Sequence, residues 1–185
     1  MQNIFENTIT NVAKVLNDAG FPPILVGGWA VNFLGFTRNT VDFDFMILED
    51  KFDIVTSVLE AEGYSVAVKT SLYARFKYKD DEDFKYIDCL FANLSTYNKL
   101  KAESTNIELF DTNFLLPKPL HIIAMKLHAV KHGTLFRGSK DFDDIVMLVE
   151  IHDIDISQKS EFKAMCDRYA DNDIYKRIKN EVIGK

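Results

Sequence analysis

The fold is decided by residues 27–45, a stretch with the sequence GGWAVNFLGFTRNTVDFDF. A short apolar strand is predicted just before it, over 24–26, because three apolar residues lead there into two glycines. A short helix is predicted from Gly28 to Leu34, where another glycine closes it. Residues 41–48 alternate in character, which predicts a second strand. The stretch therefore predicts a strand, a tight turn, a helix and a strand in close succession.

Two carboxylates lie on one face of the predicted strand 41–48. Side chains alternate between the faces of a strand, so every second residue from Val41 to Ile47 points into the core. Asp42 and Asp44 then share the other face, with attachment points roughly 7 Å apart. Two carboxylates this close repel each other unless a cation lies between them, and a hard divalent ion is suited to oxygen ligands. An amphipathic strand with a polar outer face is the alternative interpretation.

A third carboxylate, Asp88, lies in a strand predicted over 84–92. Its neighbours are apolar, and an unpaired charge is costly to bury among them. If this strand lies beside 41–48, three carboxylates converge and form a site for one or two Mg²⁺ ions. In the alternative, hairpin pairing places Asp88 at a rim beside Arg75.

Gly27 and Gly28 lie at the predicted junction of strand and helix. Glycines let the backbone approach a ligand closely, and a helix N-terminus offers free N–H groups to a phosphate. A Gly-Gly pair is also usual in tight turns, so its position matters more than its presence. Thirteen residues separate Gly28 from Asp42, and one short unit would supply both a phosphate cradle and a metal site.

The rest of the chain predicts further strands and helices around this unit. Helices are expected at 3–19 and 50–62, strands at 64–69, 72–79 and within 107–116, a solvated turn at 79–83, and helices after Pro117, one of them capped by Ser139. The stretch 93–106 is polar and is assigned no element. The order predicts an α/β (α+β) protein with a small mixed sheet flanked by helices. Residues 1–116 would form the core, and 117–185 a helical part packed on it as one compact unit.

Composition narrows the class of protein. The 185 residues fit one domain, and 15 Phe with seven Tyr suffice for a sizeable core. The apolar runs are far shorter than the roughly 20 residues that cross a bilayer, the N-terminus does not resemble a secretory signal, and two cysteines form no disulfide framework. A cytoplasmic protein without membrane contact is expected. The net charge of −6 argues against broad nucleic-acid binding, but residues 99–140 carry +4, enough for one phosphorylated ligand.

Two segments resemble a known superfamily. The stretch 27–45 resembles the signature of the nucleotidyltransferases related to DNA polymerase β, in which a G-G turn precedes a D-x-D strand. The stretch MKLHAVKHGTLFRGSKDFDDIVML, residues 125–148, resembles the helix pair of AbiEii-type toxin nucleotidyltransferases. The matching residues of this second motif are Lys126, Ala129, Arg137, Lys140, Asp141 and Asp144. The resemblance covers roughly residues 20–150 and implies the nucleotidyltransferase fold.

The resemblance implies roles for the three aspartates. Asp42, Asp44 and Asp88 would hold Mg²⁺, or Mn²⁺ in its place, on a nucleoside triphosphate such as ATP, with Gly27 and Gly28 close to the phosphates. Asp88 would help to activate an acceptor hydroxyl, which attacks the α-phosphorus and expels pyrophosphate.

The resemblance also implies helpers for nucleotide binding. Lys126, a fourth catalytic candidate beside the aspartates, and Lys140 would compensate the charge of the triphosphate. Arg38 and Asp141 are further nucleotide-binding candidates. Each has a simpler interpretation. Lys126 would extend its ammonium group to water, Asp141 would be a favourable acid in the first turn of a capped helix, and Asp144 would form a surface ion pair with Arg137.

The acceptor is not apparent from the sequence. The helix pair favours the toxin-like branch, which implies a tRNA, protein or small-molecule acceptor and a cognate antitoxin as a partner. Antibiotic-modifying nucleotidyltransferases share a G-G-W turn, which resembles Gly27-Gly28-Trp29, and they form the first alternative. The second alternative is a non-catalytic protein of the same fold that binds a nucleotide or a partner.

Overall fold

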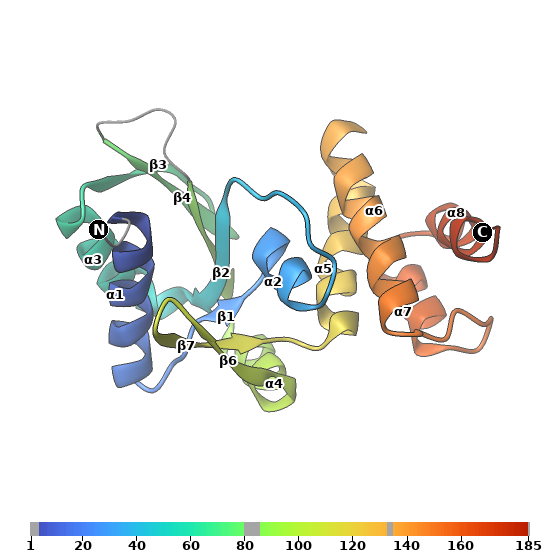
Figure 1. Cartoon of the computed structure of the whole chain (residues 1–185), viewed down its shortest axis with the longest axis horizontal. Coiled ribbons are helices and arrows are strands. Elements are labelled where there is room, and N and C mark those ends of the chain that lie inside the picture. Colours follow the sequence, from blue (N-terminus) through green and yellow to red (C-terminus); the bar gives the residue numbers. More distant parts are fainter. Residues whose placement is uncertain (1–3, 80–85, 133–134, 185) are drawn as a thin grey trace. The chain divides into compact units, whose positions relative to one another are not determined.

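The computed structural model describes residues 4–79, 86–132 and 135–184; within them, the side chains of 135–137 are not among those described. In this part of the chain there are eight α-helices and one seven-stranded mixed sheet (Figure 1). The expectation of an α/β (α+β) protein built on a mixed sheet is confirmed. None of the described helices is long and apolar enough to cross a membrane.

The elements follow one another in mixed order along the chain. The helices are α1 (Ile4–Asp18), α2 (Gly27–Phe33), α3 (Phe52–Ala61), α4 (Leu94–Glu103), α5 (Pro119–His132), α6 (Leu135–Ile151), α7 (Glu161–Tyr169) and α8 (Asn172–Ile183). The strands are β1 (Ile24–Leu25), β2 (Phe43–Leu48), β3 (Tyr64–Lys69), β4 (Tyr73–Tyr78), β5 (Ile87–Ala92), β6 (Thr105–Leu109) and β7 (Thr112–Leu116). A 3₁₀ turn, Glu49–Lys51, precedes α3.

The chain divides into two compact units. The first combines residues 1–30 with 39–117 and contains the sheet, and the second combines 31–38 with 118–185 and contains the last four helices. The segment 31–38, which begins inside α2, therefore belongs with helices that follow it by some 80 residues or more. The close packing of the core and the helical part as one compact unit stays a prediction.

The sheet of the first unit has the strand order β3-β4-β5-β2-β1-β7-β6. Strand β2 runs parallel to β5, and β1 runs parallel to β7, whereas the other neighbours are antiparallel. The central β2 thus lies between a strand that precedes it in the sequence and one that follows it by about 40 residues. This arrangement brings side chains that are distant in sequence onto one stretch of sheet surface.

Helices α1 and α3 cover one face of this sheet (Figure 1). The ring of Phe5 in α1 lies 6.0 Å from that of Phe43 in β2, and the ring of Phe52 in α3 lies 6.0 Å from that of Phe76 in β4. All four rings are buried, which accounts for the position of both helices. Because side chains alternate along a strand, the residues next to Phe43 and Phe76 point to the opposite face.

The second unit has a core of its own. Helices α5 to α8 contribute apolar side chains that are 2% exposed or less, among them Ile123, Leu127, Ile145, Leu148, Val149, Phe162 and Ile178. Side-chain caps begin the last two helices. Ser160 accepts a hydrogen bond from the backbone N–H of Lys163, and Asp171 accepts bonds from two N–H groups of the first turn of α8.

The structure differs from the predicted elements at three places. Residues 93–106, left without an element, contain α4, which Asn93 caps by accepting from the backbone N–H of Thr96. Ser139 is not a cap, because α6 already begins at Leu135. Val41 does not point into the core but is 67% exposed, because β2 begins two residues later. The turn predicted at 79–83 falls outside the described residues except for its first one.

The thiol of Cys166 in α7 makes the unfolding free energy of the chain depend on pH in the alkaline range. Burial, more than its charged neighbours, raises the pKa of this thiol from 9.0 to about 12. The folded chain then holds a proton that the unfolded chain releases, so this contribution is complete below pH 9.0 and is lost as the pH rises toward 12. In this pH range, we expect the unfolding free energy of Cys166→Ala to fall less steeply than that of the wild type. The difference in slope is up to about 1.4 kcal/mol per pH unit. Urea unfolding at several alkaline pH values measures both slopes, and equal slopes would contradict the expectation.

Candidate active site

Three charged residues line up across the centre of the sheet. Asp44 in β2 is the register partner of Asp88 in the parallel strand β5, and Asp88 is the register partner of Arg75 in the antiparallel strand β4. Register partners on neighbouring strands project from the same face. All three side chains therefore lie on the face opposite α1 and α3. Of the two places that the sequence left open for Asp88, beside the strand 41–48 and beside Arg75, the structure shows both.

Arg75 binds two of the three aspartates. Its Nε atom donates to Oδ1 of Asp88 at 2.8 Å and its Nη2 atom donates to Oδ2 at 2.6 Å, which makes a bidentate ion pair. The same Nη2 atom lies 3.7 Å from Oδ2 of Asp42. The Oδ2 atoms of Asp42 and Asp88 thus lie no farther apart than the sum of their distances to Nη2 of Arg75. We call Asp42, Asp44, Asp88 and Arg75 the aspartate cluster.

The electrostatics of the cluster follow from its contacts. Asp88 is 4% exposed, so its charge needs a partner, which Arg75 supplies. The hydrogen bond to Asp88 raises the pKa of Arg75 above its already high ordinary value, although burial opposes this, and Asp42 adds to the rise. Tyr86 contributes a ring whose centroid is 5.0 Å from the guanidinium carbon. Arg75 is therefore a permanent cation within the cluster.

Gly27 makes room for the carboxylate of Asp44. The backbone N–H of Val26 donates to the carbonyl of Asp44 at 3.1 Å, which holds the start of α2 against β2. Gly27 has a φ of +62°, and a β-carbon built on it would overlap the Asp44 carboxylate and lie 2.7 Å from the Asp44 Cβ. Two causes therefore require glycine at position 27. One is the closeness of the Asp44 side chain in β2, and the other is the positive φ of Gly27 itself.

Gly27→Ala is expected to destabilise the chain by more than the backbone strain alone. A left-handed residue other than glycine costs roughly 1–2 kcal/mol, and here the Asp44 side chain must also move. Gly20→Ala is the matched control, because Gly20 has a φ of +80° but no atom within 4 Å of the added carbon. Chemical unfolding of both variants measures the two costs. An equal loss in both would show that Asp44 yields freely to the new methyl group.

A second group of ionic side chains lies inside the second unit. Arg38 donates two hydrogen bonds, of 2.6 and 2.7 Å, to the carboxylate of Asp144 in α6. The Nζ atom of Lys126 in α5 lies 2.5 Å from the same carboxylate. Lys126 also donates to Asp141 at 2.8 Å. The amide of Asn32 holds the loop by bonding both the backbone N–H and the carbonyl of Arg38, at 3.0 Å each. We call Arg38, Lys126, Asp141 and Asp144 the helix-pair network.

The simpler interpretations of these residues are wrong. Lys126 does not extend to water, because the residue is 6% exposed and its ammonium group is paired. Asp141 lies in the middle of α6 and not in its first turn. Asp144 is fully buried, so it forms no surface ion pair. The side chain of Arg137, its expected partner, falls outside the described ones.

The candidate residues thus gather in two places, one in each unit. Gly27 and the three aspartates come together in the first unit, with Gly28 buried as the next residue of α2. Arg38, Lys126 and Asp141 come together in the second unit, whereas Lys140 is exposed on α6. Arg75 was foreseen only as a neighbour of Asp88. Its role in the cluster depends on strand register, which no local pattern reveals.

The fit of the cluster to a metal ion is partial. No group of three or more His, Cys, Asp or Glu side chains placed to hold a metal ion occurs in the described part of the chain. Both oxygens of Asp88 are already hydrogen-bonded to Arg75. Asp42 and Asp44, two carboxylates two residues apart, offer the type of oxygen ligand that a hard divalent cation prefers.

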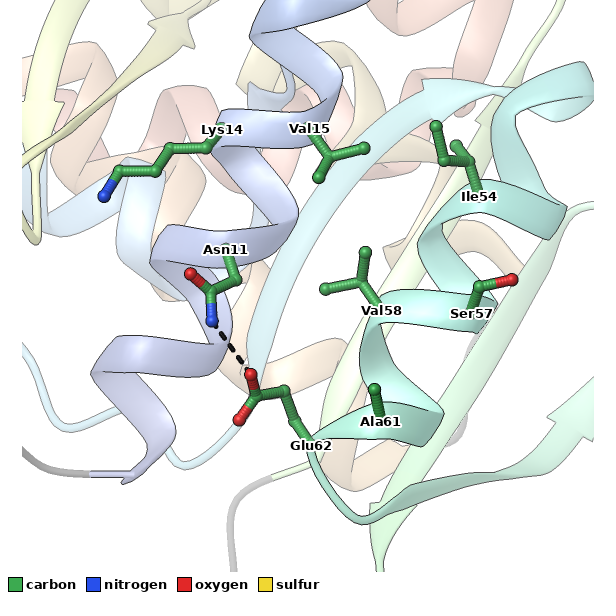
Figure 2. A pocket seen from close by; sticks show the side chains of 8 residues that line it. All are labelled: Asn11, Lys14, Val15, Ile54, Ser57, Val58, Ala61 and Glu62. Carbon is green, nitrogen blue, oxygen red and sulfur yellow. Dashed lines mark hydrogen bonds between the residues drawn. The ribbon is translucent and has the colours of Figure 1, made fainter.

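A separate groove of about 510 Å³ lies on the other side of the sheet, between α1 and α3 (Figure 2). Val15, Ile54 and Val58 give it an apolar floor, and Asn11 donates to Glu62 at 2.8 Å across one end. Because α1 and α3 cover the face opposite the aspartates, this groove is not part of the aspartate cluster.

Solved structures share this fold. The adenylyltransferase ANT(2'')-Ia in complex with adenylyl-2''-tobramycin has a TM-score of 0.63 at 14% identity, and the match covers 91% of this chain and 100% of that one. An antigenic nucleotidyltransferase-like protein from Paracoccidioides brasiliensis has a TM-score of 0.58 at 16% identity, over 97% and 91% of the two chains. The lincosamide antibiotic adenylyltransferase LnuA has a TM-score of 0.55 at 18% identity, over 79% and 97%. The expected nucleotidyltransferase fold is confirmed.

The sequence comparison identifies the family. None of the curated proteins compared with the chain matches it. The family model of the aminoglycoside-2''-adenylyltransferases matches residues 8–117, which include every residue of the aspartate cluster. The match spans more than half of the 185 residues. Closeness to AbiEii-type toxins stays a prediction. This chain belongs to the aminoglycoside-2''-adenylyltransferase family and is a nucleotidyltransferase.

Proposed function

We propose that this protein transfers the adenylyl group of ATP to a hydroxyl group of a small molecule of the antibiotic type. The observation that carries the proposal is the side-by-side placement of Asp44 and Asp88, next to Gly27, within the stretch that matches the family. The similar solved structures add support, since one contains adenylyl-2''-tobramycin and another contains lincomycin.

The charge of the first unit favours a cationic acceptor. Its sequence contains nine Lys and Arg against 17 Asp and Glu, a net charge of −8, whereas the whole chain carries −6. An acidic surface attracts a polycation and repels nucleic acid. An aminoglycoside, which carries several ammonium groups, is the acceptor class that fits both this charge and the family.

The residues of the cluster have distinct tasks in the proposed reaction. Asp88 accepts the proton of the acceptor hydroxyl, whose oxygen forms a bond to the α-phosphorus of ATP while the bond to the pyrophosphate breaks. Arg75 holds the Asp88 carboxylate in one orientation through its two hydrogen bonds. Gly27 and Gly28 lie next to the phosphates, because residues without side chains let a phosphate approach the backbone.

Asp42 and Asp44 would hold the divalent cation, Mg²⁺ or Mn²⁺, of the proposed reaction. When bound, this cation neutralises charge on the triphosphate and on the departing pyrophosphate. Asp44 projects from the sheet beside Gly27, and Asp42 lies just before β2, near Arg75, so the phosphates and their counter-charge would come together.

The toxin-like branch is the second candidate function. It is favoured by the motif of the helix pair, whose residues Lys126, Asp141 and Asp144 join in one network. A tRNA or protein acceptor and a cognate antitoxin belong to this candidate. Nucleotide binding by Arg38, Lys126, Lys140 and Asp141 stays a prediction for both candidates.

Transfer of labelled AMP from α-labelled ATP tests the proposal. The chain is incubated with Mg²⁺ and, in separate reactions, with tobramycin, lincomycin, bulk tRNA or a protein extract. Label on tobramycin, with release of pyrophosphate, is the expected result. Label on tRNA or protein would favour the toxin-like branch instead, and no transfer to any acceptor would overturn both candidates.

A further inference from the structure

Arg75 brings its guanidinium group to two carboxylates of the aspartate cluster. Its guanidinium bonds both oxygens of Asp88, at 2.8 and 2.6 Å, and reaches to 3.7 Å from Asp42. The ring of Tyr86 lies 5.0 Å away and adds a third support. A cation held by two carboxylates and an aromatic ring is well fixed, although its side chain is 30% exposed.

The charge of the cluster points the same way. Arg75 already compensates part of the negative charge that the carboxylates of the cluster bring together. A second divalent cation would have to approach Asp88 against the permanent charge of Arg75 and would compete for oxygens that are already bonded.

We propose that Arg75 is the resident counter-ion of Asp88 and limits the nucleotide-free cluster to one divalent cation, held by Asp42 and Asp44. The proposal rests on the proposed function only in that it concerns the same cluster. The proposal gives the acids different roles. Asp88, bonded to Arg75, acts on the acceptor, while Asp42 and Asp44 hold the cation.

Titration with Mn²⁺ alone, followed by the loss of the free-ion signal in electron paramagnetic resonance, tests this proposal without nucleotide or acceptor. Arg75→Met removes the charge and both hydrogen bonds. It is expected to bind Mn²⁺ at least tenfold more tightly than the wild type, or to bind one additional ion. Adding Asp88→Asn to this variant is expected to abolish the gain, because the released carboxylate is the new ligand.

Lys77→Met is the matched control for the change in net charge. Lys77 lies two residues along the same strand and is exposed, and its register partner is Ser65, not an aspartate. Its removal is expected to change Mn²⁺ affinity less than twofold. A gain equal to that of Arg75→Met would overturn the proposal, because bulk charge would then explain both.

A second variant tests the proposal if Arg75→Met does not fold. Arg75→Lys keeps the charge but cannot form the bidentate pair, and a gain of at least threefold in Mn²⁺ affinity is expected from it. Unchanged number and affinity of Mn²⁺ ions in the folded variants would overturn the proposal, as would two tightly bound ions in the wild type. Failure of AMP transfer would overturn the proposed function alone, because the titration needs no reaction.

Discussion

Asp44→Asn is expected to lower the rate of adenylyl transfer about a thousandfold, equivalent to about 4 kcal/mol of transition-state stabilisation. The amide has nearly the shape of the carboxylate, so the fit against Gly27 and the register with Asp88 are kept. What is lost is one of the two charges proposed to hold the cation that neutralises the triphosphate. Steady-state pyrophosphate release with the best acceptor measures the loss.

Stability is expected to respond differently from activity. Asp44 and Asp88 are neighbours with like charges, so the neutral amide relieves repulsion and leaves the unfolding free energy unchanged or slightly higher. Asp50→Asn is the control, since Asp50 is an exposed carboxylate just beyond the other end of β2. It makes the same change in net charge and is expected to keep the transfer rate within about twofold. Near wild-type transfer by Asp44→Asn would remove Asp44 from the proposed reaction.

Local sequence patterns predicted the acids but left open which strands lie beside them. Alternation placed Asp42 and Asp44 on one face, and the glycine pair before them marked the turn that Asp44 requires. Alternation does not show which strands become neighbours. The pairing of Asp44 with Asp88, and of Asp88 with Arg75, depends on a parallel and an antiparallel contact that join distant parts of the chain. Sequence reasoning therefore offered Arg75 as the neighbour of Asp88 only as an alternative to the convergence of the acids, and it did not show that both arrangements occur together.

The errors in element boundaries have similar causes. The alternating pattern begins at Val41, but the strand begins at Phe43, where pairing with Ile87 begins. Ser139 has the chemistry of a helix cap, yet the helix already begins at Leu135, because intrinsic preference is a weak guide against tertiary contacts. Helix α4 was missed since its apolar side chains are few, although Tyr97 and Leu100 are buried three residues apart.

Asp144→Ala is expected to destabilise the second unit by about 3–5 kcal/mol. The carboxylate is fully buried and bonded to Arg38 and Lys126, and Lys126 is itself 6% exposed. Removing the acid takes a charged partner from both Arg38 and Lys126, and water cannot reach Lys126 without local opening. Asp143→Ala is the matched control, because the adjacent Asp143 is exposed and its loss is expected to cost less than about 0.5 kcal/mol.

A variant without the three charges separates the ionic contacts from the packing around them. If the loss in Asp144→Ala comes from the cations that lose their carboxylate, then Arg38→Met/Lys126→Met/Asp144→Leu, which removes all three charges and fills the space, should be more stable than Asp144→Ala by at least about 2 kcal/mol. Urea unfolding followed by far-ultraviolet circular dichroism reports the helices, while the fluorescence of Trp29, the chain's one tryptophan, reports the first unit. A triple variant as unstable as Asp144→Ala would show that the shape of the carboxylate, and not its charge, holds α5 and α6 together.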